Sequence, residues 1–89
     1  MNNDTIWKFQ LKTTDEQTVE MPANAEILSV QTQSGIPCIW AMVNPKNEKV
    51  SRVFHIFGTG HAIPKADRKF IGTYQPEGGV FVFHLFEVL

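Results

Sequence analysis

Hydrophobic and polar residues alternate with a period of two along most of this chain. Trp7, Phe9 and Leu11, for example, are separated by lysine and glutamine, which is the pattern of a β-strand with one buried face. No segment has the three- and four-residue spacing of an amphipathic helix. The pattern therefore predicts an all-β protein.

Turn-forming residues separate the predicted strands. Ser34-Gly35 is a compact hairpin turn between two apolar runs, and Gly72 inside a strand marks a bulge or a close backbone approach. The strands are expected at residues 7–12, 27–33, 36–43, 49–57, 68–75 and 80–88, with 18–21 as an additional short candidate. We expect a small antiparallel barrel or sandwich of about six short strands, in one domain over residues 1–89.

The segment 36–43, and residues 80–86 of the last segment, are apolar on both faces. Such a strand at an exposed sheet edge promotes aggregation. We therefore expect each to be central in its sheet or paired across a subunit contact, and we expect a homo-oligomer.

The net charge is only −1, which argues against general electrostatic binding to a nucleic-acid polymer or an anionic membrane. The charge is uneven, because residues 1–45 contain two Lys against five acids, whereas residues 46–89 contain six Lys or Arg against four acids. Arg52, Lys65, Arg68 and Lys69 surround an irregular stretch at 58–67. They are either solvated surface charges or part of a site for a small anion.

Cys38 is the only cysteine, so an internal disulfide is excluded, and we expect it to pack as a small apolar residue. The first residues have neither the basic nor the apolar region of a signal peptide, and no apolar run approaches transmembrane length. We expect a soluble cytoplasmic protein without a cofactor.

The segment Gly58-Thr59-Gly60-His61 follows an apolar strand. Two glycines around a hydroxyl residue let the backbone turn sharply and expose its N–H groups, and an imidazole follows directly. This corner is a candidate site for a phosphate or a carboxylate, and it is equally compatible with a simple tight turn.

The three histidines raise the question of metal binding or catalysis. His55 and His84 lie within apolar strands, where a core or interface histidine is the commoner outcome, and no paired ligand motif supports a metal site. A nucleophile elbow, a phosphate-binding loop and the paired His-x-Thr/Ser motif are all absent from the sequence. We expect no catalytic residue and no metal site, and we regard an enzyme as the less favoured class.

A binding function remains. Trp40, Tyr74 or Trp7 are candidates for stacking on a base, and Arg52, Lys65 or Arg68 for contacting phosphates. Each aromatic residue is more often part of a core than of a ligand platform. Together with the glycine-containing corner they favour a small nucleotide over a polymer.

Several segments, taken in order, also carry a family resemblance: 22–31, 35–41, 58–61, 71–75 and 82–87. Over about residues 6–87 the chain resembles a family of short, uncharacterised proteins encoded by tailed phages and prophages. The resemblance implies a phage or prophage origin and expression in the bacterial cytoplasm, and it assigns no catalytic residue.

Small phage proteins of this kind often counteract host defence, and one class sequesters nucleotide immune signals. The hypothesis is a non-catalytic homo-oligomer that holds such a signal. The predicted ligand-binding residues are Gly58, Thr59, Gly60, His61, Arg52, Arg68, Trp40 and Tyr74. The alternatives are a protein–protein inhibitor of a host defence enzyme, a phage structural or assembly accessory, and a small hydrolase that uses His61.

Overall fold

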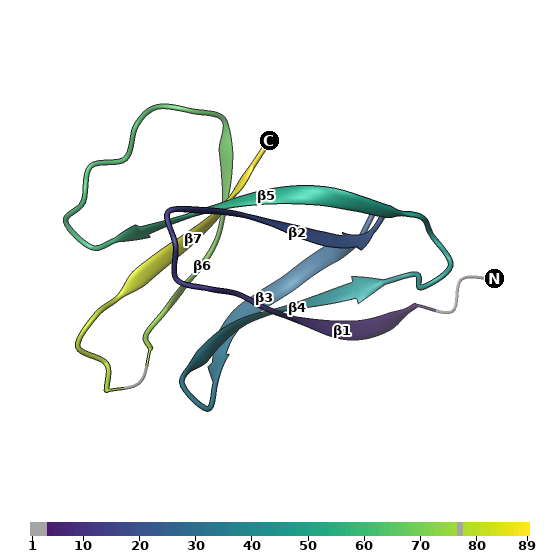
Figure 1. Cartoon of the computed structure of the whole chain (residues 1–89), viewed down its shortest axis with the longest axis horizontal. Coiled ribbons are helices and arrows are strands. Elements are labelled where there is room, and N and C mark those ends of the chain that lie inside the picture. The colour runs from purple at the N-terminus through teal and green to yellow at the C-terminus, as the bar shows by residue number, and fades with distance from the viewer. Residues whose placement is uncertain (1–3, 77) are drawn as a thin grey trace.

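The computed structural model describes residues 4–76 and 78–89, and it forms two antiparallel β-sheets that pack face to face (Figure 1). The strands are β1 (Thr5–Gln10), β2 (Glu16–Pro22), β3 (Glu26–Gln33), β4 (Ile36–Val43), β5 (Lys49–Gly58), β6 (Arg68–Tyr74) and β7 (Phe83–Val88). The first sheet has the order β1-β4-β3 and the second the order β2-β5-β7-β6. Over the described residues, the expected all-β antiparallel fold is confirmed as a sandwich of seven strands rather than about six, without a closed barrel.

The core lies between the two sheets and is built from alternate residues of the strands. Ile39, Phe54 and Leu85 are fully buried. Successive side chains of a strand point to opposite faces, and these three point into the space between the sheets. Cys38 is also buried, as expected, and its Sγ contacts the carbonyl oxygen of Ile36 at 3.6 Å.

The two strands that are apolar on both faces are central in their sheets. β4 pairs with β1 and β3, and β7 pairs with β5 and β6. Both edges of β7 are therefore satisfied within one chain, so this strand needs no second copy. The homo-oligomer stays a prediction.

Strand β7 is shorter than expected, since residues 80–82 lie outside it. The neighbouring strand β6 ends at Tyr74, which pairs with Phe83, and Pro76 follows soon after. Residues 80–82 therefore have no partner strand in β6, and Val80 and Phe81 are exposed.

The Ser34-Gly35 hairpin and the bulge at Gly72 are confirmed. Ser34 and Gly35 have φ angles of 52° and 79°, the two positive values that a type I′ turn requires. The pairing of β6 with β7 shifts register between Phe70 and Gly72. A Cβ at Gly72 would lie 2.7 Å from Cγ1 of Val30 on β3, so this glycine also allows the two sheets to approach closely.

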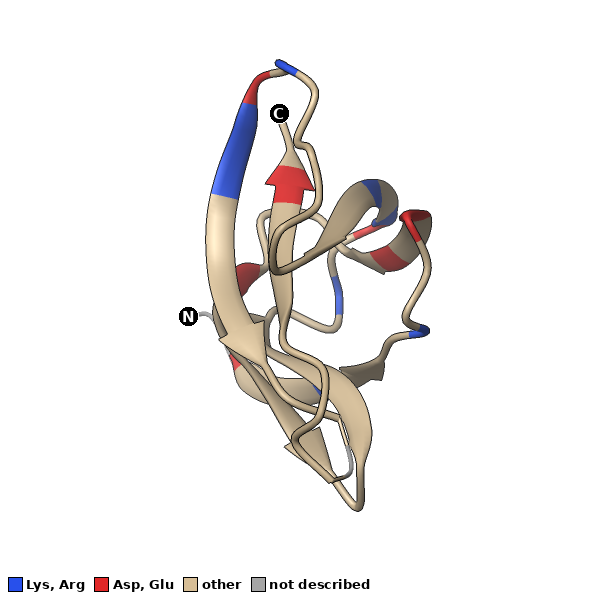
Figure 2. Ribbon diagram, turned by 90° about the vertical axis from the view of Figure 1, so that its left-hand side faces the viewer, with Lys and Arg blue, Asp and Glu red and all other residues tan. Residues whose placement is uncertain are grey.

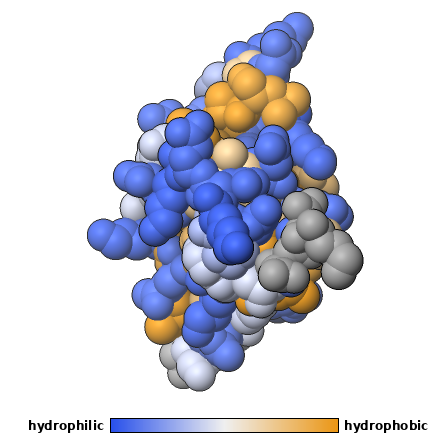
Figure 3. Space-filling view, turned by 90° about the vertical axis from the view of Figure 1, so that its right-hand side faces the viewer, coloured by the Kyte–Doolittle hydropathy of each residue, from blue (hydrophilic) through white to orange (hydrophobic). Residues whose placement is uncertain are grey.

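The loops that connect the strands gather at the two ends of the sandwich. The β5–β6 loop, the β6–β7 connection and the β3–β4 turn lie at one end (Figure 1). The opposite end includes the polar loop at 44–48 and is predominantly hydrophilic (Figure 3). The described residues contain no helix that is long and apolar enough to cross a membrane.

Candidate functional site: two hollows that meet at His61

The Gly58-Thr59-Gly60-His61 corner is a hydrogen-bonded turn at the end of β5. The amide of His61 donates to the carbonyl of Gly58 at 3.1 Å, and Gly60 has a φ of 88°, as expected for the third residue of a type II turn. The amide of Thr59 donates to the carbonyl of Val82 at 3.1 Å. One of the N–H groups proposed for an anion, that of Thr59, therefore serves the fold instead.

Gly58 has a second role, because the His61 ring packs directly over it. A Cβ on Gly58 would lie 3.0 Å from Cε1 and 3.1 Å from Nδ1 of His61, which is closer than most real Cβ contacts. The imidazole thus occupies the space that a side chain at position 58 would fill. Any larger residue there would push His61 away.

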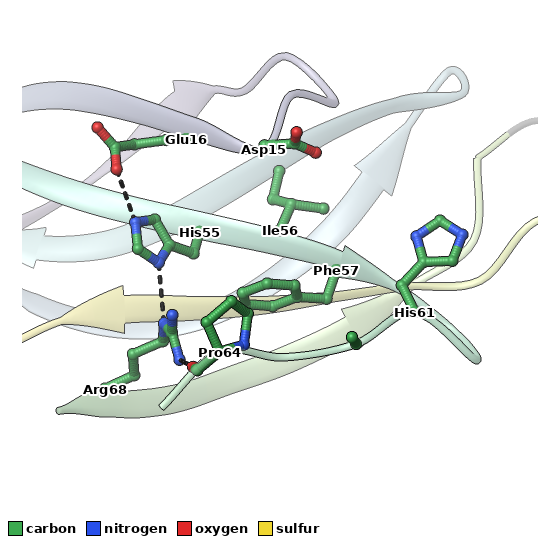
Figure 4. A pocket seen from close by; sticks show the side chains of 9 residues that line it. Asp15, Glu16, His55, Ile56, Phe57, His61, Pro64 and Arg68 are labelled. Atoms are coloured by element: carbon green, nitrogen blue, oxygen red, sulfur yellow. Dashed lines mark hydrogen bonds and ion pairs between the residues drawn. The ribbon is translucent and has the colours of Figure 1, made fainter. Parts of the chain in front are cut away.

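One hollow, the loop hollow, lies beneath the β5–β6 loop and has a volume of about 420 Å³. Figure 4 shows Glu16, His55 and Arg68 aligned at one end, with Phe57 and Pro64 between them and His61 at the other end. It is lined by Asp15, Glu16, His55, Ile56, Phe57, His61, Ala62, Pro64 and Arg68.

Arg68 is held in one orientation at the wall of the loop hollow. Its Nε donates to Nδ1 of His55 at 2.8 Å, and its Nη1 donates to the carbonyl of Pro64 at 2.6 Å. Its guanidinium carbon lies 5.0 Å from the centre of the Phe57 ring, within the range of a cation–π contact. Arg68 therefore ties the loop to the sheet, while its Nη2 has no hydrogen-bond partner among the described residues.

The hydrogen bonds of His55 fix its tautomer. An arginine can only donate, so Nδ1 of His55 must accept from Arg68, and the ring proton must lie on Nε2. That nitrogen lies 2.8 Å from Oε1 of Glu16 and donates to it. In this tautomer the ring is neutral, and both of its nitrogens are engaged.

His84 is also engaged at both nitrogens. Nε2 lies 2.8 Å from Oγ1 of Thr59, and Nδ1 lies 2.9 Å from Oγ1 of Thr73. These contacts join β7 to the Gly58–His61 turn and to β6. His84 and the hydroxyl of Thr59 thus help to hold the turn in place.

A second hollow, the phenylalanine hollow, lies on the other side of His61 and has a volume of about 500 Å³. Its walls are mostly apolar, and its two aromatic rings, Phe81 and Phe83, have centroids 6.3 Å apart. It is lined by Gly58, Thr59, His61, Val80, Phe81, Val82 and Phe83. His61 contributes to both hollows and is exposed, and its ring has no hydrogen bond within residues 4–76 and 78–89.

Charges of both signs surround the loop hollow. Lys65, Asp67, Arg68 and Lys69 lie where the loop leads into β6, and Asp15 and Glu16 are among the lining residues. Residues 70–76 and 78–86 carry no Lys, Arg, Asp or Glu, and Figure 2 shows these two stretches without blue or red. The electrostatic environment is mixed rather than strongly basic.

Three of the predicted binding residues, Arg52, Trp40 and Tyr74, lie away from the two hollows. Arg52 forms a two-bond ion pair with Glu87, through Nε at 2.6 Å and Nη2 at 2.8 Å, and its Nη1 donates to the carbonyl of Ala25 at 2.6 Å. Trp40 lies on β4 in the other sheet. The structure does not bring either of them to the Gly58–His61 turn.

Tyr74 is part of the core rather than of a hollow at the turn. Its side chain is 3% exposed, and its hydroxyl lies 2.9 Å from Oγ1 of Thr13. Burial raises the pKa of Tyr74 above its ordinary value, and the hydrogen bond with Thr13 opposes part of that effect. The predicted residues that do come together are Gly58, Thr59, Gly60, His61 and Arg68.

Several residues of the two hollows were missed in the sequence. The alternation along β5 places His55 and Phe57 on one face, which is a usable signal for that pair. Glu16 lies outside the strands expected from the sequence, although it begins β2 and faces His55 in the pairing register. Phe81 was assigned to a strand, and its exposure follows only from where β6 ends.

The histidines do not form a common centre. Within the described part of the chain, no three His, Cys, Asp or Glu side chains are arranged to hold a metal ion. His55 pairs with Glu16 and Arg68, His84 pairs with two threonines, and His61 stands alone.

Residues 2–89 match a family described as a domain of unknown function (DUF7352), and the chain belongs to that family. No curated protein and no solved structure matches the chain.

Proposed function

We propose that the protein binds and retains, without transforming it, a small nucleotide-derived ligand at the loop hollow, and that it thereby sequesters a bacterial immune signal. The observation that carries the proposal is the fixed guanidinium of Arg68, with Nη2 free of partners among the described residues, in a hollow that also contains His61. The role in counter-defence rests on the resemblance to phage and prophage proteins.

A pre-oriented guanidinium favours binding of an anion. The contacts of Arg68 with His55, Pro64 and Phe57 hold the group in place before a ligand arrives, so little side-chain entropy is lost on binding. The spare N–H groups are the donors that a phosphate oxygen accepts.

The mixed charge of the hollow favours a nucleotide over a simple anion. Asp15 and Glu16 also line the hollow, and their carboxylates are acceptors that would repel a free phosphate. A ligand that carries hydroxyl donors as well as a phosphate could satisfy both kinds of group at once. The ribose of a nucleotide supplies such donors.

Retention is favoured over turnover by the state of the histidines. A general acid or base must exchange a proton with the substrate. His55 and His84 would each have to give up a hydrogen bond to do so, because both nitrogens of each ring are engaged. His61 alone would be available, without a partner to orient it among the described residues.

The test is retention of a mixed panel of cyclic oligonucleotides and cyclic ADP-ribose isomers. The protein is incubated with the panel, desalted and heat-denatured, and the released compounds are identified by mass spectrometry. We expect one compound to be returned intact at close to one equivalent per site. A chemically altered compound would indicate an enzyme, and a protein that retains nothing would contradict the proposal.

Variants locate the site. Arg68→Lys keeps the charge but loses the planar donors, and His61→Ala removes the free imidazole, so both should lower retention by about tenfold, the effect of losing one charge-assisted hydrogen bond. Lys69→Ala is the matched control, because Lys69 is an exposed cation next to Arg68 that does not line the hollow. Equal retention by all four proteins would exclude this site.

A second candidate function is inhibition of a partner protein through an apolar surface. Val80 is 78% exposed and Phe81 is 67% exposed, in the connection between β6 and β7. Exposed aromatic residues are typical anchors of protein interfaces. A stoichiometric complex with a host protein, lost on Phe81→Ser and formed without any small molecule, would favour this function.

A further inference from the structure

The phenylalanine hollow is an unassigned cavity directly beside the loop hollow. We infer that it takes a planar aromatic group, the nucleobase of the same ligand whose anionic group is held near Arg68. This inference rests on the proposed function and names a second subsite for its ligand.

The first argument is that the two hollows are neighbours, separated by the side chain of His61. His61 lines both, it is exposed, and its ring has no hydrogen bond to the described residues. A ligand in the loop hollow would reach the phenylalanine hollow by passing this one side chain. The volumes, about 420 Å³ and 500 Å³, are within the range of small-molecule sites.

The second argument is the chemistry of the walls. Phe81 and Phe83 present two rings whose planes are inclined by only 35°, and the loop hollow offers no comparably exposed ring, since Arg68 already lies over Phe57. Bases stack on such aromatic faces with little regard to sequence. The lining residues include no Lys, Arg, Asp or Glu, and His61 is their one ionisable side chain. Such a lining suits the apolar face of a base and disfavours a phosphate.

The third argument is the exposure of Phe81. Phe81 is 67% exposed, and covering its ring with an apolar group lowers the free energy of the complex. Its neighbour Phe83 is held by the contact with Tyr74, at a centroid distance of 5.7 Å. The fixed ring of Phe83 and the exposed ring of Phe81 together leave one apolar surface uncovered, on the far side of His61 from the loop hollow.

The experiment compares three probes: adenosine 5′-monophosphate, ribose 5-phosphate and adenosine. Each is titrated into the ¹⁵N-labelled protein, and amide chemical shifts are followed. We expect the monophosphate to shift the amides of residues 80–83 as well as those near Arg68, whereas ribose 5-phosphate shifts only the latter. Phe81→Ala should weaken binding of the monophosphate by about tenfold, the typical effect of losing one stacking partner, and leave ribose 5-phosphate unchanged.

Phe70→Ala is the control, because Phe70 is another exposed phenylalanine that lies on β6 and lines neither hollow. It should leave the affinities of all three probes unchanged. Equal loss of affinity in Phe70→Ala and Phe81→Ala would indicate a general effect on the fold and would overturn the inference.

The remaining outcomes separate the two proposals. Equal binding of the monophosphate and ribose 5-phosphate, insensitive to Phe81→Ala, would overturn the base subsite and leave the anion site standing. Adenosine binding at residues 80–83 with no response to ribose 5-phosphate would show that the phenylalanine hollow takes a base, and would overturn the anion site near Arg68 and with it the proposed function. No response to any probe would overturn both. Shifts at residues 80–83 that depend on protein concentration alone would show that a second copy fills the hollow, and would overturn the inference.

Discussion

Tyr74 shows how one polar atom is accommodated in the core of a small sandwich. Its ring packs against Phe83, and its hydroxyl reaches Oγ1 of Thr13 in the β1–β2 connection. A buried hydroxyl without a partner is costly, so this hydrogen bond allows tyrosine at a core position. Thr13 is exposed and can exchange that bond for water.

A pH dependence follows from the raised pKa of Tyr74. In the unfolded chain the phenol ionises near pH 10, while the folded protein still holds the proton, so the unfolded state is favoured as pH rises above 10. Below pH 10 both states are protonated and the contribution is constant. We expect the wild type to lose stability above pH 10 relative to Tyr74→Phe, which cannot ionise.

Urea unfolding of both proteins between pH 8 and pH 11 measures this difference. Near neutral pH, Tyr74→Phe should cost about 1 kcal/mol for the hydrogen bond with Thr13. A stability difference that stays the same from pH 8 to pH 11 would contradict the expected titration. The comparison cancels the lysines, which ionise in both proteins.

At the scale of elements, the close approach of β3 and β6 decides how the two sheets meet at one side. The bulge between Phe70 and Gly72 reorients β6, and the absence of a side chain at Gly72 leaves space for Val30. A bulge bends a strand and increases its twist. The Gly72 position therefore couples the local geometry of β6 to the packing of the two sheets.

Gly72→Ala should destabilise the protein by about 1–3 kcal/mol, the usual cost of overpacking a core. Its new Cβ would lie 2.7 Å from Cγ1 of Val30. In a Val30→Ala background that methyl group is gone, and Gly72→Ala should cost much less. A double-mutant cycle with urea unfolding gives the coupling. Additive costs would show that Val30 is not the obstacle.

At the scale of the whole molecule, Arg52 connects the two sheets. It lies on β5, pairs with Glu87 on β7, and donates to the carbonyl of Ala25 just before β3. Both side chains of the pair are largely buried. The ion pair lies within the second sheet, between the neighbouring strands β5 and β7, and the hydrogen bond to Ala25 makes the link to the first sheet.

Arg52→Met should destabilise the protein by about 3 kcal/mol, the lower end for a broken buried pair, because the carboxylate of Glu87 would lose its partner. Combining it with Glu87→Leu should recover much of that loss. Thermal or urea unfolding of the single and double variants checks this. If the double variant is as unstable as the sum of the single ones, the pair does not act as a unit.

The double variant also separates structure from binding. Since Arg52 lies outside both hollows, the folded double variant should retain ligand as the wild type does. If the double variant unfolds in the same transition as the wild type but no longer retains ligand, Arg52 contributes to ligand binding after all.

The sequence by itself determined the all-β class, most of the strands, the Ser34-Gly35 hairpin and the special role of Gly72. These features depend on neighbours within a few residues, through the period of two and the conformational freedom of glycine. The sequence also located the Gly58–His61 turn and Arg68. Only the tertiary structure decided which strands pair, and hence that Arg52 faces Glu87, that His55 lies between Glu16 and Arg68, and that residues 80–82 lack a strand partner in β6. These contacts join residues 13 to 39 positions apart, and such pairings depend on the register of the whole sheet rather than on any local pattern.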